Sequence, residues 1–118
     1  MQDLVRFYKA VGADAMEVVG RLGGMPDLVK RFLGKFHADR SFYDLEEAFG
    51  NDDKDKAFLA AHTLKGTCAN LGIQSLFTPS SAITELLRAG KMEEAKVEFP
   101  ALKREYLRVL DALKELGV

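Results

Sequence analysis

Apolar side chains recur every three or four residues along most of this chain, which is the spacing that places them on one face of an α-helix. No segment alternates apolar and polar residues as a half-buried strand does. Two short helices are expected first, one that Gly12 ends and one that Asp14 caps and Gly23-Gly24 closes. Their apolar stripes are Leu4, Phe7, Tyr8 and Val11, and then Met16, Val19 and Leu22.

Two longer helices are expected before the middle of the chain. Pro26 suits the first turn of one of them. Amide groups in the first turn have no hydrogen-bond partner within the helix, so proline loses no helical hydrogen bond there. This helix should end near Ala38-Asp39. Ser41 is the expected cap of the next helix, which Gly50-Asn51-Asp52 ends. The apolar stripes are Leu28, Val29, Phe32, Leu33 and Phe36, and then Phe42, Leu45, Ala48 and Phe49.

The most regular pattern runs from Asp53 to Gly72 and predicts the central helix of the fold. Its apolar positions advance in steps of four and three residues, so they form one seam that faces a core. The residues of this seam are Ala57, Ala61, Leu64, Cys68 and Leu71.

The last part of the chain predicts two more helices. Pro79 either starts, kinks or interrupts the first, which Gly90 stops. The second begins near Met92, with Pro100 as a candidate kink. Four long helices with short connections predict an all-α fold, an antiparallel four-helix bundle with additional short N-terminal helices packed across it. The stripes are Leu76, Ile83, Leu86 and Leu87, and then Phe99, Leu102, Tyr106, Val109, Leu110 and Leu113.

Composition narrows the class of protein. A length of 118 residues with 47% hydrophobic content is enough for one core, so we expect a single helical domain over 1–118. With 17 basic and 18 acidic side chains, the chain has no overall field that would attract nucleic acid or an anionic membrane. No apolar run approaches the ~20 residues of a membrane span, and the first residues lack a signal-peptide pattern. The lone Cys68 suits a reducing compartment, and no Cys/His cluster has metal-ligand spacing. We therefore expect a cytoplasmic protein without a metal.

His62 falls on the side of the central helix that points away from the seam. An exposed helix face usually carries long polar side chains, whereas here small and apolar residues surround one imidazole and one ammonium. A small apolar patch of this kind, ringed by polar groups, is typical of a docking site. The helical neighbours of His62 are Phe58, Leu59, Lys65, Gly66, Ala69 and Asn70.

Two of these neighbours suggest the chemistry. Glycine in a helix interior costs roughly 1 kcal/mol relative to alanine, and Gly66, one turn beyond His62, lets another protein approach the imidazole. The ammonium of Lys65 can balance the charge of a phosphoryl group in the same space. Because a neutral imidazole has a free ring nitrogen that can act as a nucleophile, we predict that His62 carries a phosphoryl group. His37, near a helix end, is expected to have only a capping or surface role.

The run from Ala61 to Gly72 resembles the His-x-Leu-Lys-Gly signature of histidine-containing phosphotransfer (HPt) domains, with its following small residues and Leu-Gly. The similarity continues upstream through 23–28 with Phe32 and Phe36, and downstream through 82–86. The resemblance implies a four-helix bundle, usually monomeric, that relays phosphate between aspartates without a nucleotide or cofactor of its own. Its partners would be receiver domains of response regulators or hybrid histidine kinases.

The resemblance also implies roles for single residues. His62 matches the phosphoacceptor, Lys65 the basic residue beside the phosphate, and Gly66 the small residue that admits the partner. Some relatives carry a glutamine near the position of Thr84 that orients the imidazole, so Thr84 is a candidate for an orienting or docking contact, with water bridging its shorter side chain. The residues expected to contact the partner are Phe58, Leu59, Gly66, Ala69 and Asn70.

Three other kinds of helical bundle are alternatives to a phosphotransfer domain. The phosphoacceptor domain of a sensor kinase usually has an acidic residue after its histidine and a proline soon afterwards, whereas here Thr63 follows and no proline occurs before Pro79. A metal-binding bundle would need Glu-x-x-His pairs, which are absent. A docking bundle that no longer transfers phosphate stays open. The initial methionine and the absence of linkers favour a free-standing protein.

Overall fold

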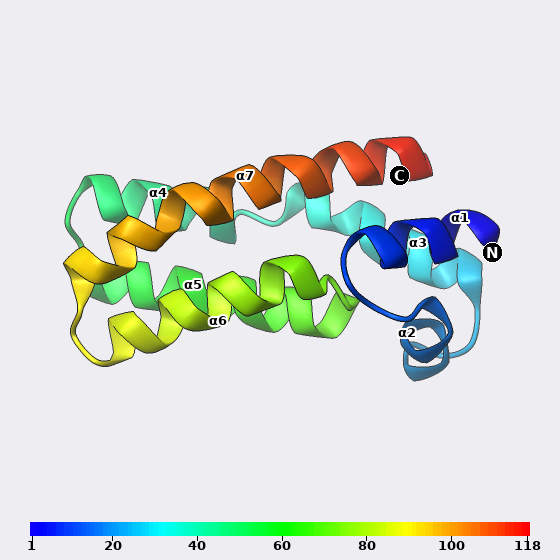
Figure 1. Cartoon of the computed structure of the whole chain (residues 1–118), viewed down its shortest axis with the longest axis horizontal. Coiled ribbons are helices and arrows are strands. Elements are labelled where there is room, and N and C mark those ends of the chain that lie inside the picture. The colour runs from blue at the N-terminus through cyan, green and yellow to red at the C-terminus, as the bar shows by residue number, and fades with distance from the viewer.

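The computed structural model describes all 118 residues and contains seven α-helices, one 3-10 turn and no strand (Figure 1). The predicted all-α fold is therefore confirmed. None of the helices combines the length and the apolar character that a membrane span requires. The elements in chain order are α1 (Gln2–Ala10), α2 (Ala15–Arg21), α3 (Pro26–Lys35), η1 (Phe36–Ala38), α4 (Ser41–Gly50), α5 (Lys54–Leu71), α6 (Gln74–Arg88) and α7 (Met92–Leu116).

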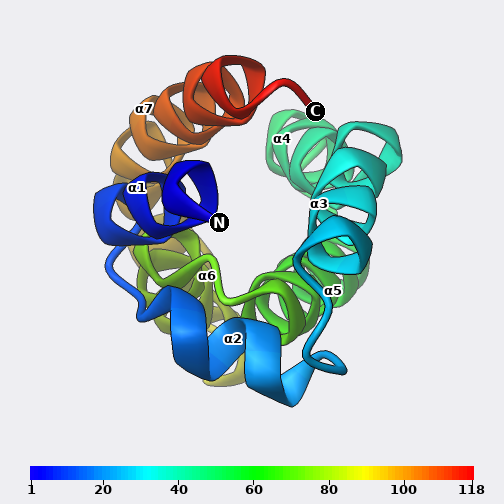
Figure 2. The ribbon, with the colours of Figure 1, turned by 90° about the vertical axis from the view of Figure 1, so that its right-hand side faces the viewer.

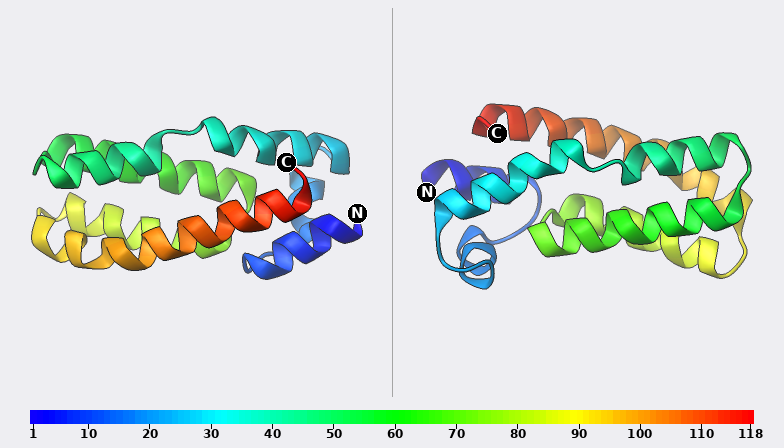
Figure 3. Two further views of the ribbon diagram at one scale, coloured as in Figure 1. Left: turned by 90° about the horizontal axis from the view of Figure 1, so that it is seen from above. Right: turned by 180° about the vertical axis from the view of Figure 1, so that it is seen from behind.

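The last four helices form an antiparallel bundle, and the whole molecule is elongated, 42 Å in its longest dimension. Consecutive helices are neighbours, with α4 against α5, α5 against α6 and α6 against α7. Helix α3 continues the direction of α4 beyond the break at η1 (Figure 3). Seen along the bundle, the helices surround one core, and α1 and α2 lie across the end that also holds both chain termini (Figures 1 and 2). This arrangement confirms the predicted bundle with short N-terminal helices.

The core is one cluster of 30 buried apolar residues to which every α-helix contributes. An aromatic stack in its middle joins α4 to α7, with the ring centroids of Phe42 and Tyr106 4.0 Å apart. Helix α5 packs on the core through the apolar seam that the sequence predicts. All five residues of this seam are buried: Ala57, Ala61, Leu64, Cys68 and Leu71. Because the seam fixes the rotation of α5 about its axis, the opposite side of this helix faces solvent.

Most helix ends follow the sequence prediction. The Asp14 carboxylate caps α2, and that of Asp53 accepts the amide of Lys56 at the start of α5. Ser41 is not the cap of α4, contrary to the prediction. It is the first helical residue, and the Asp39 carboxylate accepts both its amide hydrogen, at 2.8 Å, and its hydroxyl hydrogen. An aspartate two residues earlier takes over the capping because its side chain reaches the first free amide.

Both internal prolines lie inside continuous helices. Pro79 is within α6 and Pro100 within α7, so Pro79 neither starts nor interrupts its helix. One residue after Pro79, the Ser80 hydroxyl donates a hydrogen bond to the carbonyl of Leu76 at 2.6 Å. Tertiary packing therefore outweighs the loss of one helical hydrogen bond at each proline.

The N-terminal helices hold the carboxyl end of α5. The Tyr8 hydroxyl donates to the carbonyl of Leu71 at 2.8 Å, and the Arg21 guanidinium donates to that of Asn70 at 3.1 Å. Carbonyls in the last turn of a helix have no partner within the helix. Since α1 and α2 supply these donors, they brace the helix that carries His62.

Candidate functional site on the outer face of helix α5

Seven of the predicted site residues share the solvent-facing side of α5, which we call the outer face. His62 is exposed near its middle, and Leu59 is 65% exposed. Lys65, three residues after His62 on the same helix, is half-buried. The residues of the outer face are Phe58, Leu59, His62, Lys65, Gly66, Ala69 and Asn70.

Gly66 borders open space. A Cβ atom built on this residue would meet no heavy atom within 4 Å outside its own helix backbone. Its backbone is helical, so no left-handed conformation calls for glycine here. Nothing within the chain explains the absence of a side chain one turn from His62.

Phe58 stacks beside the imidazole. The ring centroids of Phe58 and His62 are 5.9 Å apart, with an angle of 21° between the ring planes. The Arg88 guanidinium from α6 lies 5.0 Å from the centroid of the Phe58 ring. Arg88 Nε in turn donates to the Glu85 carboxylate at 2.9 Å. Neither Glu85 nor Arg88 stands out in the sequence, because no sequence pattern shows which side of α6 meets Phe58.

Glu85 lies among positive charges at this edge of the outer face. The hydrogen bond from Arg88 is the main cause that lowers the pKa of the Glu85 carboxyl, and the charges of Arg88, Lys65 and His62 lower it further. The charges of Lys65 and His62 act on Glu85 less strongly than the hydrogen bond from Arg88. The surroundings of the imidazole thus combine two basic groups with one carboxylate.

Thr84 does not reach the outer face. Its side chain is fully buried, and its hydroxyl donates to the carbonyl of Ser80 at 2.7 Å. This corrects the expectation that Thr84 contacts a partner or orients the imidazole. The reason is the rotation of α6, whose buried residues Ile83 and Leu87 turn position 84 toward the core and position 85 outward.

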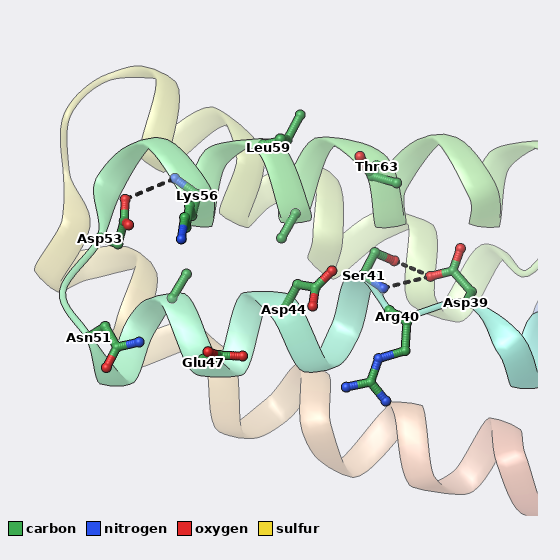
Figure 4. A pocket seen from close by; sticks show the side chains of 12 residues that line it. Asp39, Arg40, Ser41, Asp44, Glu47, Asn51, Asp53, Lys56, Leu59 and Thr63 are labelled. Carbon is green, nitrogen blue, oxygen red and sulfur yellow. Dashed lines mark hydrogen bonds between the residues drawn. The ribbon is translucent and has the colours of Figure 1, made fainter.

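Grooves flank the outer face on the side of α3 and α4. The groove between α4 and α5 is lined by Leu59 and Thr63 from α5 and by acidic side chains from α4 (Figure 4). The groove between α3 and α5, about 650 Å³ in volume, is lined by His62 and Gly66 together with Phe32 and other residues. His62 therefore stands at the edge of a concave surface that a convex partner could fill.

Other candidate nucleophiles are placed less favourably. Cys68 is fully buried, and burial raises the pKa of its thiol to about 12, so it stays protonated and out of reach. His37 is exposed near the C-terminus, with Nε2 3.1 Å from the carbonyl of Val118. No group of three or more His, Cys, Asp or Glu side chains is arranged to hold a metal ion.

A family model described as the Hpt domain matches residues 27–115, from the first turn of α3 to the last turn of α7. The chain belongs to the Hpt domain family. Hpt domains are phosphocarrier modules of two-component phosphorelays and lack kinase machinery. Searches of curated proteins and of solved structures found no match to this chain. Helices α1 and α2 lie outside the matched region, so one domain over 1–118 stays a prediction, supported by the bonds of Tyr8 and Arg21 to α5.

Proposed function

We propose that this Hpt domain relays phosphate through His62, which takes a phosphoryl group from the aspartate of one receiver domain and delivers it to that of another. The observation that carries the proposal is the exposed His62 at the centre of the outer face, beside open space at Gly66 and within the region that matches the family. The partners would be receiver domains of response regulators or of hybrid histidine kinases.

The chemical step needs only one nucleophile from this chain. The lone pair of Nε2 on a neutral His62 attacks the phosphorus of the aspartyl phosphate, and an N–P bond forms as the P–O bond to the aspartate breaks. The electron pair of the broken bond leaves on the aspartate carboxylate. In the delivery step, a carboxylate oxygen of the second receiver attacks the same phosphorus, and the pair of the N–P bond returns to Nε2. Both steps are in-line displacements, so they depend on positioning.

The neighbours of His62 would assist by charge and by contact. The Lys65 ammonium would neutralise charge on the phosphoryl oxygens, alongside the divalent cation that the receiver supplies. Gly66 would let the backbone of the receiver approach the imidazole. Contact with the receiver would exclude water from the reacting atoms and would involve Phe58, Leu59, Gly66, Ala69 and Asn70.

Replacement of the nucleophile tests the proposal. We expect the wild-type chain, mixed with a panel of phosphorylated receiver domains, to acquire acid-labile, base-stable phosphate, and His62→Gln to acquire none. His37→Gln is the matched control because it removes the other exposed histidine and should keep full labelling. Circular dichroism should show the same helical content in all three proteins.

Two outcomes would overturn the proposal. Labelling of His62→Gln would show that another residue accepts the phosphate. A wild-type chain that binds receivers without acquiring label would be a docking bundle instead.

A further inference from the structure

The imidazole of His62 packs beside the aromatic ring of Phe58 and makes no hydrogen bond within the chain. No side chain or carbonyl of the chain hydrogen-bonds it, and the hydroxyl of Thr84 is bonded within α6. Phe58, one turn earlier on α5, lies beside it with ring planes 21° apart. A nearly parallel ring at this distance restricts rotation of the imidazole about its χ2 angle.

Phe58 is itself fixed on two sides. It is half-buried and packs against the hydrophobic core, unlike the neighbouring Leu59, which is 65% exposed. Above its ring lies the Arg88 guanidinium, 5.0 Å from the centroid, in the arrangement of a cation–π contact. Glu85 holds this guanidinium through a hydrogen bond of 2.9 Å. The chain of contacts runs from α6 through Phe58 to the imidazole.

We propose that Phe58, backed by Arg88 and Glu85, is a positioning residue that sets the plane of the His62 imidazole for phosphoryl transfer. This inference rests on the proposed function of His62. The lone pair of a ring nitrogen lies in the ring plane, so the orientation of that plane decides whether the lone pair points at the phosphorus. A stacked neighbour covers a ring face and leaves both nitrogens at the free edge. A nucleophile that is oriented in advance loses less entropy when it reaches the in-line geometry.

Two substitutions at Phe58 distinguish the effect of its aromatic ring from that of an apolar side chain at this position. Phe58→Leu keeps an apolar side chain but removes the ring, whereas Phe58→Tyr keeps the ring. Because Phe58 also belongs to the proposed receiver contact, we expect Phe58→Leu to raise the Kd of the receiver. We expect it in addition to lower the maximal transfer rate at saturating receiver roughly two- to tenfold, and Phe58→Tyr to restore the rate. Arg88→Gln should lower the rate in the same direction by a smaller factor.

The control for Arg88 is Arg108→Gln. Arg108 pairs with Glu105 at the same i,i+3 spacing but lies on α7, beside the carbonyl of Ala10. Its replacement removes an equivalent ion pair away from α5 and should leave the transfer rate unchanged. Thermal unfolding of each variant shows whether a change in rate follows a loss of folded protein.

Nuclear magnetic resonance of the unphosphorylated chain gives a readout that does not depend on transfer. The ring protons of His62 are assigned by their absence in His62→Gln. Their nuclear Overhauser contacts with the α and β protons of His62, which report the χ2 angle, should change in Phe58→Leu and Arg88→Gln but not in Arg108→Gln. An unchanged set of these contacts together with an unchanged maximal rate in Phe58→Leu would overturn the inference, as would a change confined to the Kd. If the wild-type chain accepts no phosphate, the proposed function fails, while these proton contacts still show whether Phe58 orients the imidazole.

Discussion

The two sides of helix α5 differ in what their small residues do. On the inner side, Ala57, Ala61 and Cys68 are fully buried, and their size lets α4 and α6 pack closely against α5. On the outer face, Gly66 and Ala69 are exposed and no helix packs on them. Folding of the chain accounts for the first set and not for the second. An exposed patch of small and apolar side chains, flanked by polar groups, is typical of a protein interaction site.

Two glycines of the same region make the contrast sharper. At Gly72 the backbone is left-handed, with φ +74°, and an added Cβ would lie 2.6 Å from Cγ2 of Val18. At Gly66 the backbone is helical, and an added Cβ would meet nothing within 4 Å. Gly72 is therefore required by the fold, whereas Gly66 is available for function.

The largest difference in the free energy of unfolding is expected between alanine variants of two leucines, one on the inner side of α5 and one on the outer face. Leu64→Ala empties a fully buried site and should lower the free energy of unfolding by about 2–5 kcal/mol. Leu59→Ala changes an exposed side chain and should stay within about 0.5 kcal/mol of the wild type, yet it should weaken receiver binding. Urea titrations and binding isotherms measure the two effects. Equal losses of stability would show that the outer face is part of the core.

A long side chain at Gly66 should block the partner without harm to the fold. We expect Gly66→Gln to lower the rate of transfer from a phosphorylated receiver on the order of a hundredfold, because the receiver cannot reach its in-line position. The matched control is Gly20→Gln, since Gly20 is also a helical glycine with nothing within 4 Å of an added Cβ, but it lies in α2. A Gly66→Gln protein that transfers phosphate at the normal rate would contradict the access role of Gly66.

Replacement of Gly72 and of Gly66 by alanine should change the free energy of unfolding in opposite directions. Gly72→Ala combines a left-handed backbone with a clash against Val18 and should cost roughly 2–3 kcal/mol. Gly66→Ala should stabilise the helix by about 0.5–1 kcal/mol because alanine loses less backbone entropy. Urea unfolding of both variants measures the difference. A destabilised Gly66→Ala would reveal a structural reason for this glycine.

The smallest predicted effect concerns the charge of Glu85 at the edge of the outer face. Its pKa is lowered first by Arg88 and then by Lys65 and His62, so Arg88→Gln should raise it more than Lys65→Met does. Because the folded pKa lies below the unfolded one, the Glu85–Arg88 pair stabilises the fold at neutral pH, and this contribution is lost as the pH falls through the lowered pKa. Carbon-13 titration of the Glu85 carboxyl measures both shifts. An unchanged pKa in Lys65→Met would place Lys65 away from this cluster.

Much of the fold and the centre of the candidate site could be predicted from sequence. The five seam residues of α5 are buried as the pattern required, and the same helical geometry places His62 and Gly66 outside. Two predictions are wrong. Ser41 does not cap its helix, because the Asp39 carboxylate accepts the amide hydrogen of Ser41 itself and Ser41 is the first helical residue. Thr84 does not belong to the outer face, because the packing of α6 buries it.

Which side of α5 faces solvent follows from the sequence alone, because the 3.6-residue period relates neighbours on one helix and needs no information from another. The rotation of α6 against α5, in contrast, is visible only in the folded protein. That rotation follows from the packing of the whole core, to which all the helices contribute, and no local pattern encodes it. It turns Thr84 inward and brings Arg88 over Phe58, so the surroundings of the imidazole depend on the assembled bundle.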